Sequence, residues 1–168
     1  MNHVSSALLE HFPHLRQVLV PSHLKNLSGE DDYCFEDKEL RGALACTAEE
    51  GYLLSRAATT AQPENMLEIG SYIGWSSAHL LYDNNLHLTC VDPFIEDNGK
   101  LADKPSFAVM HRFRDNLWRA GVAHRISLWM EPSPDILSYI APKEGWDFVF
   151  IDGWHLDNQQ THDVLGVI

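Results

Sequence analysis

Residues 68–74 of the chain read Glu-Ile-Gly-Ser-Tyr-Ile-Gly, and the rest of the fold can be worked out from this stretch. The apolar run Met66–Ile69 predicts a short buried strand, and a helix is expected from about Trp75 to Tyr82. Two glycines therefore bracket a strand-to-helix turn. Glycine tolerates a positive φ and lets a ligand approach the backbone, and the helix points its free N–H groups to the same place. The pattern predicts a ligand loop, although an ordinary tight turn would show it too.

On both sides of this loop, apolar segments of strand length alternate with segments of helical period. Such alternation predicts βαβ units, and hence an α/β, Rossmann-like parallel sheet with helices on both faces. Thr47 is the expected cap of the first helix and Pro63 its end, while Ser133 is expected to cap a later helix with its hydroxyl. The expected strands are 66–69, 87–91, 126–130 and 148–151, and the later helices are about 105–120, from 133 onward and 158–168.

The chain of 168 residues fits one domain with a substantial core. We expect residues 1–46 to form an N-terminal helical or cap segment, and residues 47–168 to form the Rossmann-like domain. Residues 1–27 have mixed helical patterning, and residues 28–39 are acidic, which is typical of a solvated face.

Composition excludes several classes of function. The formal charge of −12 disfavours a nucleic-acid partner, since affinity for phosphates comes from basic residues. No apolar run approaches the roughly 20 residues of a membrane span, and the first residues do not resemble a signal peptide. Three cysteines without a paired spacing make a disulfide framework or a zinc knuckle improbable. We expect a soluble, cytoplasmic protein that contacts neither nucleic acid nor membrane.

Two acidic residues make the glycine turn more informative. Glu68 lies inside the strand, where a carboxylate is costly unless something uses it. Asp92 follows the next strand, where an acid can accept the hydroxyls of a ribose, although it could equally cap the turn at Pro93. A dinucleotide fingerprint requires glycines where this chain has Tyr72 and Trp75, and no phosphate-binding Gly-Lys-Ser/Thr follows. The residues favour a nucleoside ligand without phosphates.

Three segments resemble class I S-adenosylmethionine-dependent methyltransferases, in their order and spacing. Residues 68–76 resemble the first motif, in the form found in the O-methyltransferase branch that includes caffeoyl-CoA and macrocin-type enzymes. Residues 91–93 resemble that branch's second motif, and residues 148–155, Phe-Val-Phe-Ile-Asp-Gly-Trp-His, resemble the segment after its fourth strand. The likeness extends over about residues 47–166. It implies a Rossmann-like domain that binds S-adenosylmethionine.

The resemblance also implies roles for individual residues. The glycine loop would line the methionine part of the cofactor, with Glu68 orienting the loop, and Asp92 would hold the ribose. Ser133 would lie near the adenine, and Asp152 beside the sulfonium and the substrate. The family often has an acid just before this serine, but here the position is Pro132, so either Glu131 substitutes or adenine is held by shape and backbone. The expected cofactor-binding residues are Glu68, Gly70, Ser71, Tyr72, Gly74, Ser76, Asp92, Ser133 and Asp152.

Methyl transfer requires alignment of donor and acceptor and removal of the acceptor's proton. Asp152 and His155 are the expected catalytic residues, with His155 as the base, although His155 could also be a structural histidine. In relatives of this branch, the acid after the fourth strand often helps to bind a divalent cation. The resemblance therefore also allows a metal at Asp152.

We expect the chain to transfer a methyl group to a small-molecule acceptor, at a hydroxyl oxygen, with N- or C-methylation left open. The alternative is a non-catalytic or fragmentary domain that binds S-adenosylmethionine or a partner; a nicotinamide dehydrogenase is disfavoured by Tyr72 and Trp75. Only sixteen residues follow Asp152, whereas the methyltransferase fold continues with further strands. The C-terminal strands of the fold are thus expected to be missing, and the open edge to be closed in a homodimer. The alternative is that the 168 residues are a fragment and that the intact protein covers this edge itself.

Overall fold

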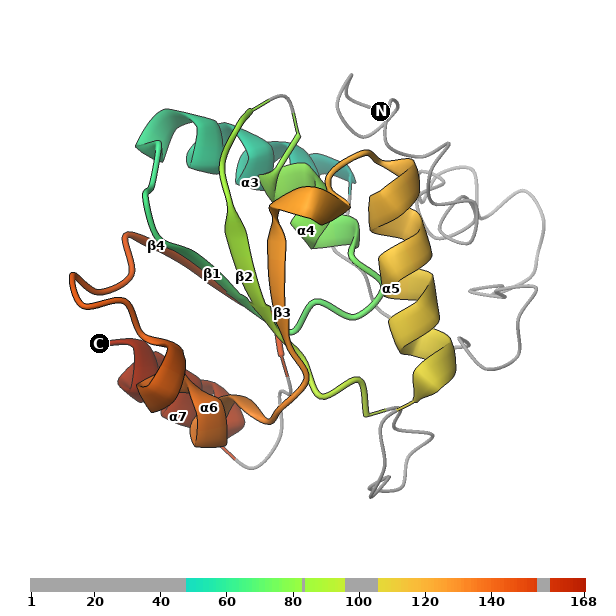
Figure 1. The fold of residues 1–168 in the computed structure, drawn as a ribbon. Helices are drawn as coiled ribbons and strands as arrows, with labels where there is room; N and C mark the ends of the chain where they lie inside the picture. The colour runs from blue at the N-terminus through green and yellow to red at the C-terminus, as the bar shows by residue number, and fades with distance from the viewer. Residues whose placement is uncertain (1–47, 83, 96–105, 154–157) are drawn as a thin grey trace, which may run out of the picture.

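The computed structural model describes residues 48–82, 84–95, 106–153 and 158–168. The expectations for residues 1–46, for the cap at Thr47 and for His155 lie outside the described residues. Within them, helices and strands alternate along the chain (Figure 1). Their bounds are α3 (Ala48–Ala61), β1 (Met66–Ile69), α4 (Trp75–Leu80), β2 (Leu88–Val91), α5 (Phe107–Arg119), the short 3-10 helix η3 (Ala123–Arg125), β3 (Ile126–Trp129), α6 (Ser133–Ile140), β4 (Phe148–Ile151) and α7 (Gln159–Val167).

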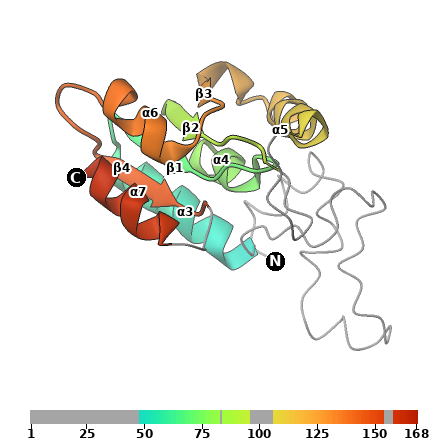
Figure 2. The ribbon, with the colours of Figure 1, turned by 90° about the horizontal axis from the view of Figure 1, so that it is seen from below.

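The four strands form one parallel sheet in the order β3-β2-β1-β4. The chain steps outward from β1 to β3 and then returns to the other side of β1 with β4. Strand β1 is buried along its whole length, and β4 is only half-buried. Helices α3, α4 and α5 lie on one face of the sheet and α6 and α7 on the other (Figures 1 and 2). The predicted α/β fold with helices on both faces is confirmed.

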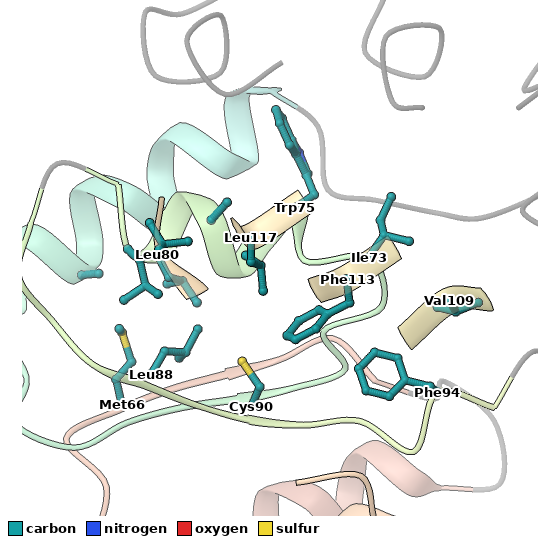
Figure 3. Close-up of a cluster of buried hydrophobic side chains, with 14 residues drawn as sticks. Met66, Ile73, Trp75, Leu80, Leu88, Cys90, Phe94, Val109, Phe113 and Leu117 are labelled. Atoms are coloured by element: carbon teal, nitrogen blue, oxygen red, sulfur yellow. The ribbon is translucent and has the colours of Figure 1, made fainter. Parts of the chain in front are cut away.

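The larger part of the core lies between the sheet and helices α3, α4 and α5. Alternate side chains of a strand point to opposite faces, so Met66 of β1 and Cys90 of β2 reach this side (Figure 3). The rings of Phe94 and Phe113 meet edge to face, with centroids 5.3 Å apart, and join the segment after β2 to α5. This packing fixes where β2 ends relative to the helices.

The opposite face has a smaller apolar cluster. Leu67, Ile69 and Val91 point from the two central strands toward Leu137 of α6, and the half-buried Val167 of α7 joins them. The packing of α6 and α7 on the sheet therefore rests on fewer buried apolar side chains than the packing of α3, α4 and α5.

Several predicted boundaries shift by a residue or two, and one predicted cap is wrong. Pro132 occupies the N-cap of α6, and Ser133 is already the first helical residue. The Ser133 hydroxyl does not cap the helix, because Pro132 holds the N-cap position from which a side-chain oxygen would accept a backbone N–H. The hydroxyl donates to the buried carboxylate of Asp163. Helix α3 ends at Ala61, two residues before the expected end at Pro63.

Within the described ranges, none of the helices is long and apolar enough to span a membrane.

Candidate functional site

The carboxyl ends of neighbouring strands are joined just past the regular sheet. The Gly70 N–H donates to the Val91 carbonyl at 2.9 Å, and the Asp152 N–H donates to the Ile69 carbonyl at 2.8 Å. Between β2 and β3, the Asp92 N–H donates to the Trp129 carbonyl at 3.0 Å. The order of the sheet reverses at β1, and ligands of open α/β sheets bind beyond the carboxyl ends at such a point. Gly70, Asp92 and Asp152 thus lie together where a ligand is expected.

The turn after β1 requires its glycines. Gly70 has φ +87° and Gly74 has φ +84°, and Tyr72 between them is also left-handed at φ +44°. The Gly74 N–H closes the turn on the Ser71 carbonyl at 2.7 Å. A Cβ on Gly70 would lie 2.3 Å from the carbonyl oxygen of Asp152, so the chain itself needs the absent side chain here. Gly70 lets the ends of β1 and β4 approach each other.

Asp92 holds this turn in place. Its Oδ2 accepts the N–H groups of Ser71 at 2.8 Å and of Tyr72 at 2.6 Å, and its Oδ1 accepts that of Phe94 at 2.6 Å. Burial raises the pKa of the Asp92 carboxyl, and the three N–H donors oppose the rise. Asp92 is therefore both the cap of the turn at Pro93 and the support of the glycine loop. A carboxylate accepts about four hydrogen bonds, and the described residues fill three of these positions on Asp92, which leaves about one for a ligand.

Glu68 supports the loop from beneath, as its place inside β1 suggested. It is fully buried, and its Oε2 accepts the hydroxyls of Ser71 at 2.8 Å and of Ser77 at 2.5 Å and the thiol of Cys90 at 3.5 Å. Burial raises the pKa of Glu68, and the nearby hydroxyls of Ser76, Ser77 and Ser71 lower it. Its other oxygen, Oε1, is buried without a hydrogen-bond partner among the described residues. Glu68 thus ties the loop to α4 and β2.

The start of α4 is fixed from α5. Gly74 is the N-cap of α4, and a Cβ there would lie 3.0 Å from Cγ of Leu117. The buried Asn116 donates its Nδ2 to the Ile73 carbonyl at 2.9 Å. Ser76, in the first turn of α4, is 7% exposed. The loop is consequently held by contacts from β1, β2, α4 and α5.

Ser133 lies in a separate polar cluster where α6 meets α7. Its hydroxyl donates to Oδ1 of Asp163, and Nε2 of Gln159 donates to the same Oδ1 at 2.8 Å and to the Ser133 oxygen at 3.2 Å. Ser133 is 7% exposed and Asp163 is fully buried. The side chain of Ser133, the first residue of α6, therefore lies against α7. That Ser133 lies near the adenine stays a prediction.

Asp152 is exposed and follows β4 directly. Its predicted partner His155 lies outside the described residues, so the catalytic pairing of the two stays a prediction. Among residues 48–82, 84–95, 106–153 and 158–168, no three His, Cys, Asp or Glu side chains come together as a metal site. Binding of a divalent cation at Asp152 also stays a prediction.

Sequence reasoning missed three residues that build the site. Asp163 and Asn116 are polar residues on helices whose partners are 30 and 43 residues away in the chain, and no local pattern marks such contacts. Ser77, which binds Glu68, had a signal, because it follows Ser76 in the first turn of the helix after the glycine loop. A buried acid in β1 requires donors from the element packed on it.

Comparisons with known proteins agree with this geometry. Residues 67–168 match the family model of a methyltransferase domain. The structure is similar to the O-methyltransferase TomG from Streptomyces achromogenes, in complex with S-adenosylmethionine, with 20% identity, a TM-score of 0.57, and coverage of 100% of this chain and 62% of that one. It is also similar to an O-methyltransferase from Bacillus cereus in complex with S-adenosylhomocysteine, with 17% identity, a TM-score of 0.58, and coverage of 98% and 70%.

A third similar structure is the S-adenosylhomocysteine-bound methyltransferase PaMTH1 from Podospora anserina, with 15% identity, a TM-score of 0.57, and coverage of 99% and 65%. At these identities the likeness shows a shared fold. The chain spans between 54% and 70% of the length of the similar solved structures. A comparison with curated protein sequences gives no match.

Proposed function

The chain belongs to the methyltransferase domain family, and from this premise we propose that it transfers a methyl group from S-adenosylmethionine to a small-molecule acceptor, at a hydroxyl oxygen. The observation that carries the proposal is the support of the glycine loop by Asp92. The carboxylate holds the amides of Ser71 and Tyr72 in a fixed turn at the carboxyl edge of the sheet. A pre-formed turn lowers the entropic cost of binding a ligand.

The residues at this edge fit the cofactor. We assign the methionine part to the backbone of residues 70–74, whose shape Glu68 maintains from below, and one ribose hydroxyl to the remaining acceptor position of Asp92. Solved structures with this fold hold S-adenosylmethionine or S-adenosylhomocysteine. Their cofactors support the same assignment for this chain.

When bound, S-adenosylmethionine supplies a methyl group on a positively charged sulfur. The chain's contribution is to align that group with the acceptor oxygen and to take the proton that the oxygen loses. Asp152 is exposed beside the end of β1, where its carboxylate favours a positively charged ligand and can orient an acceptor hydroxyl. We assign proton removal to His155, three residues further on.

A second candidate is a domain that binds the cofactor without catalysis. The observation that leaves it open is the low identity to the similar solved structures, between 15% and 21%, which shows the fold and not the reaction. Segments that complete an acceptor pocket are variable loops in many folds. The two candidates share the cofactor site and differ only in turnover.

Turnover is tested by incubating the chain with S-adenosylmethionine and a panel of phenolic, sugar and amine acceptors and measuring S-adenosylhomocysteine. The proposed function expects release above the acceptor-free rate with at least one hydroxyl compound. His155→Gln is then expected to lower turnover by about 10²–10⁴-fold while the affinity for S-adenosylhomocysteine stays near the parent's. Cofactor binding without turnover for any acceptor would favour the non-catalytic candidate, and parent-like turnover of the variant would make His155 structural.

A further inference from the structure

Asp163, on α7, is a buried carboxylate that the proposed chemistry does not yet use. Its side chain is fully buried, and Oδ1 accepts hydrogen bonds from the Ser133 hydroxyl and from Gln159. Oδ2 is buried without a hydrogen-bond partner among the described residues. A Cβ built on Gly153 would lie 3.8 Å from Oδ2, which places Asp163 close to the end of β4. The acid therefore lies behind the ligand edge of the sheet.

The contacts of Asp163 do not by themselves explain why the residue is an acid. Burying an ionised carboxylate is costly, and an oxygen left without a donor adds to the cost. An asparagine of the same shape would keep an Oδ1 acceptor for Ser133 and Gln159 and would remove the charge. If the cluster served only to dock α7, the neutral residue would do so at least as well.

The charge acts on Ser133. A hydroxyl that donates to a carboxylate becomes a stronger acceptor, because hydrogen bonds in a chain polarise one another. The Ser133 oxygen has two lone pairs and accepts from Gln159, so one lone pair is left for a ligand. Ser133 begins α6 just past β3, at the carboxyl edge of the sheet, and is 7% exposed.

We propose that Asp163 is a positioning and specificity residue for the nucleoside end of the ligand. It fixes the Ser133 hydroxyl, so that the serine oxygen accepts an N–H group and the site prefers an adenine amine to a carbonyl at that position. This inference rests on the proposed function. The inference also explains why the position before the serine can be Pro132 and not an acid. In this chain the acid is Asp163, which comes from α7.

The test compares two ligands that differ at this group, S-adenosylhomocysteine and S-inosylhomocysteine, by calorimetric titration. The parent chain is expected to prefer the adenosyl compound by about tenfold or more, the usual effect of one hydrogen bond to a polarised group. Asp163→Asn is expected to bring the ratio close to one and to leave the melting temperature equal or higher. The matched control is Asp135→Asn, which removes an exposed acid from the first turn of α6, the helix that Ser133 begins, and should leave the ratio at the parent's value.

A second variant separates the polarising effect from a general loss of packing. Ser133→Ala should abolish the preference, and Asp163→Asn combined with it should change the ratio no further. An unchanged ratio in Asp163→Asn, with S-adenosylhomocysteine still bound, would overturn the inference alone. A lower melting temperature with the ratio retained would make Asp163 purely structural. A parent chain that binds neither compound would overturn the proposed function and this inference with it.

Discussion

At the level of single residues, two carboxylates divide the task of holding the loop at 70–74. Asp92 binds the loop's backbone from the end of β2, and Glu68 binds its serine from within β1. Glu68 is fully buried and Asp92 is half-buried, so the hydrogen bonds of both acids replace lost water. The conformation of the loop therefore depends on Asp92 and Glu68, and a ligand does not have to contact every oxygen of these two acids.

Replacing Asp92 by alanine removes the acceptor for three backbone N–H groups. We expect Asp92→Ala to weaken S-adenosylhomocysteine binding by about 1.5–3 kcal/mol, the range for losing hydrogen bonds to a charged group, and to lower the melting temperature. Calorimetric titration and thermal unfolding measure the two effects. Asp92→Asn, which keeps one acceptor oxygen, should fall between the alanine variant and the parent. Parent-like binding by Asp92→Ala would remove this acid from the site.

At the level of elements, the close approach of the ends of β1 and β4 explains the glycine after β1. From the sequence alone, Gly70 makes room for a ligand; in the structure its nearest neighbours are the backbone atoms of Asp152 and Gly153. The joint between β1 and β4 is therefore tight, and the loop on one strand and the acid on the other cannot shift independently.

This joint predicts different costs for two glycines of similar conformation. Gly121 has φ +74° and open space where a Cβ would be, so Gly121→Ala should cost only the left-handed strain of about 1–2 kcal/mol. Gly70→Ala adds a clash with the Asp152 carbonyl and should cost about 3 kcal/mol or more, with loss of cofactor binding. Urea unfolding and titration test both variants. Equal costs for the two would contradict the tight joint.

Helices α3 and α4 meet at a buried histidine, which makes this contact sensitive to pH. Burial lowers the pKa of His79 from 6.5 to about 4, and its Nδ1–H donates to the Trp75 carbonyl at 2.9 Å. A Cβ on Gly51 of α3 would lie 2.5 Å from Nε2 of the ring. The neutral ring therefore fits against α3, and the unfolded chain binds its proton more readily than the folded one.

The contribution of His79 to the free energy of unfolding should consequently rise with pH between about 4 and 6.5. His79 contributes fully above its unfolded pKa, and its contribution is lost as the pH falls toward about 4. The shift of His79 alone contributes about 2 kcal/mol less at about pH 5 than at about pH 7. The raised pKa values of Glu68 and Asp92 act in the opposite direction, so the difference between His79→Gln and the parent measures the His79 part. His79→Gln should lose this part of the pH dependence, whereas the exposed control His87→Gln should keep it. Parallel stability profiles of His79→Gln and the parent would refute the assignment.

At the level of the whole molecule, the sheet ends at a half-buried strand with an apolar sequence. Strand β4 pairs only with β1 among the described residues, and α7 beside it exposes Val164, Leu165 and Ile168 at 45%, 67% and 95%. An apolar edge of this kind tends to pair with another chain. We propose that a second copy covers β4 and α7 in a symmetric homodimer.

Light scattering at micromolar concentration tests this proposal. We expect a mass of twice the 19.1 kDa of one chain. Leu165→Glu on α7 should give the single-chain mass, because a charge would be buried in the interface, whereas Leu53→Glu, at a similarly exposed position on α3, should leave the dimer intact. A monomeric parent that binds no dye for exposed apolar surface would contradict the proposed dimer.

The sequence was sufficient for the elements and for the loop, because those depend on local patterns. The apolar runs at Met66–Ile69 and Phe148–Ile151 mark their strands to the residue, and the glycines of the turn have the predicted positive φ. It was not sufficient for contacts between distant helices. Ser133 was expected to cap its own helix, but Pro132 is the N-cap. The Ser133 hydroxyl donates a hydrogen bond to a carboxylate 30 residues later, and only the packing of α7 on α6 brings the two together.

The central claim, that residues 70–74 and Asp92 form a binding site for the S-adenosyl group, is tested most directly by one calorimetric series. The chain is titrated in turn with S-adenosylmethionine, S-adenosylhomocysteine and NAD. The account predicts saturable one-to-one binding of the two S-adenosyl compounds and none of NAD, because Tyr72 and Trp75 occupy positions that a pyrophosphate requires as glycine. Binding of NAD, or no binding of either S-adenosyl compound by the folded chain, would contradict it.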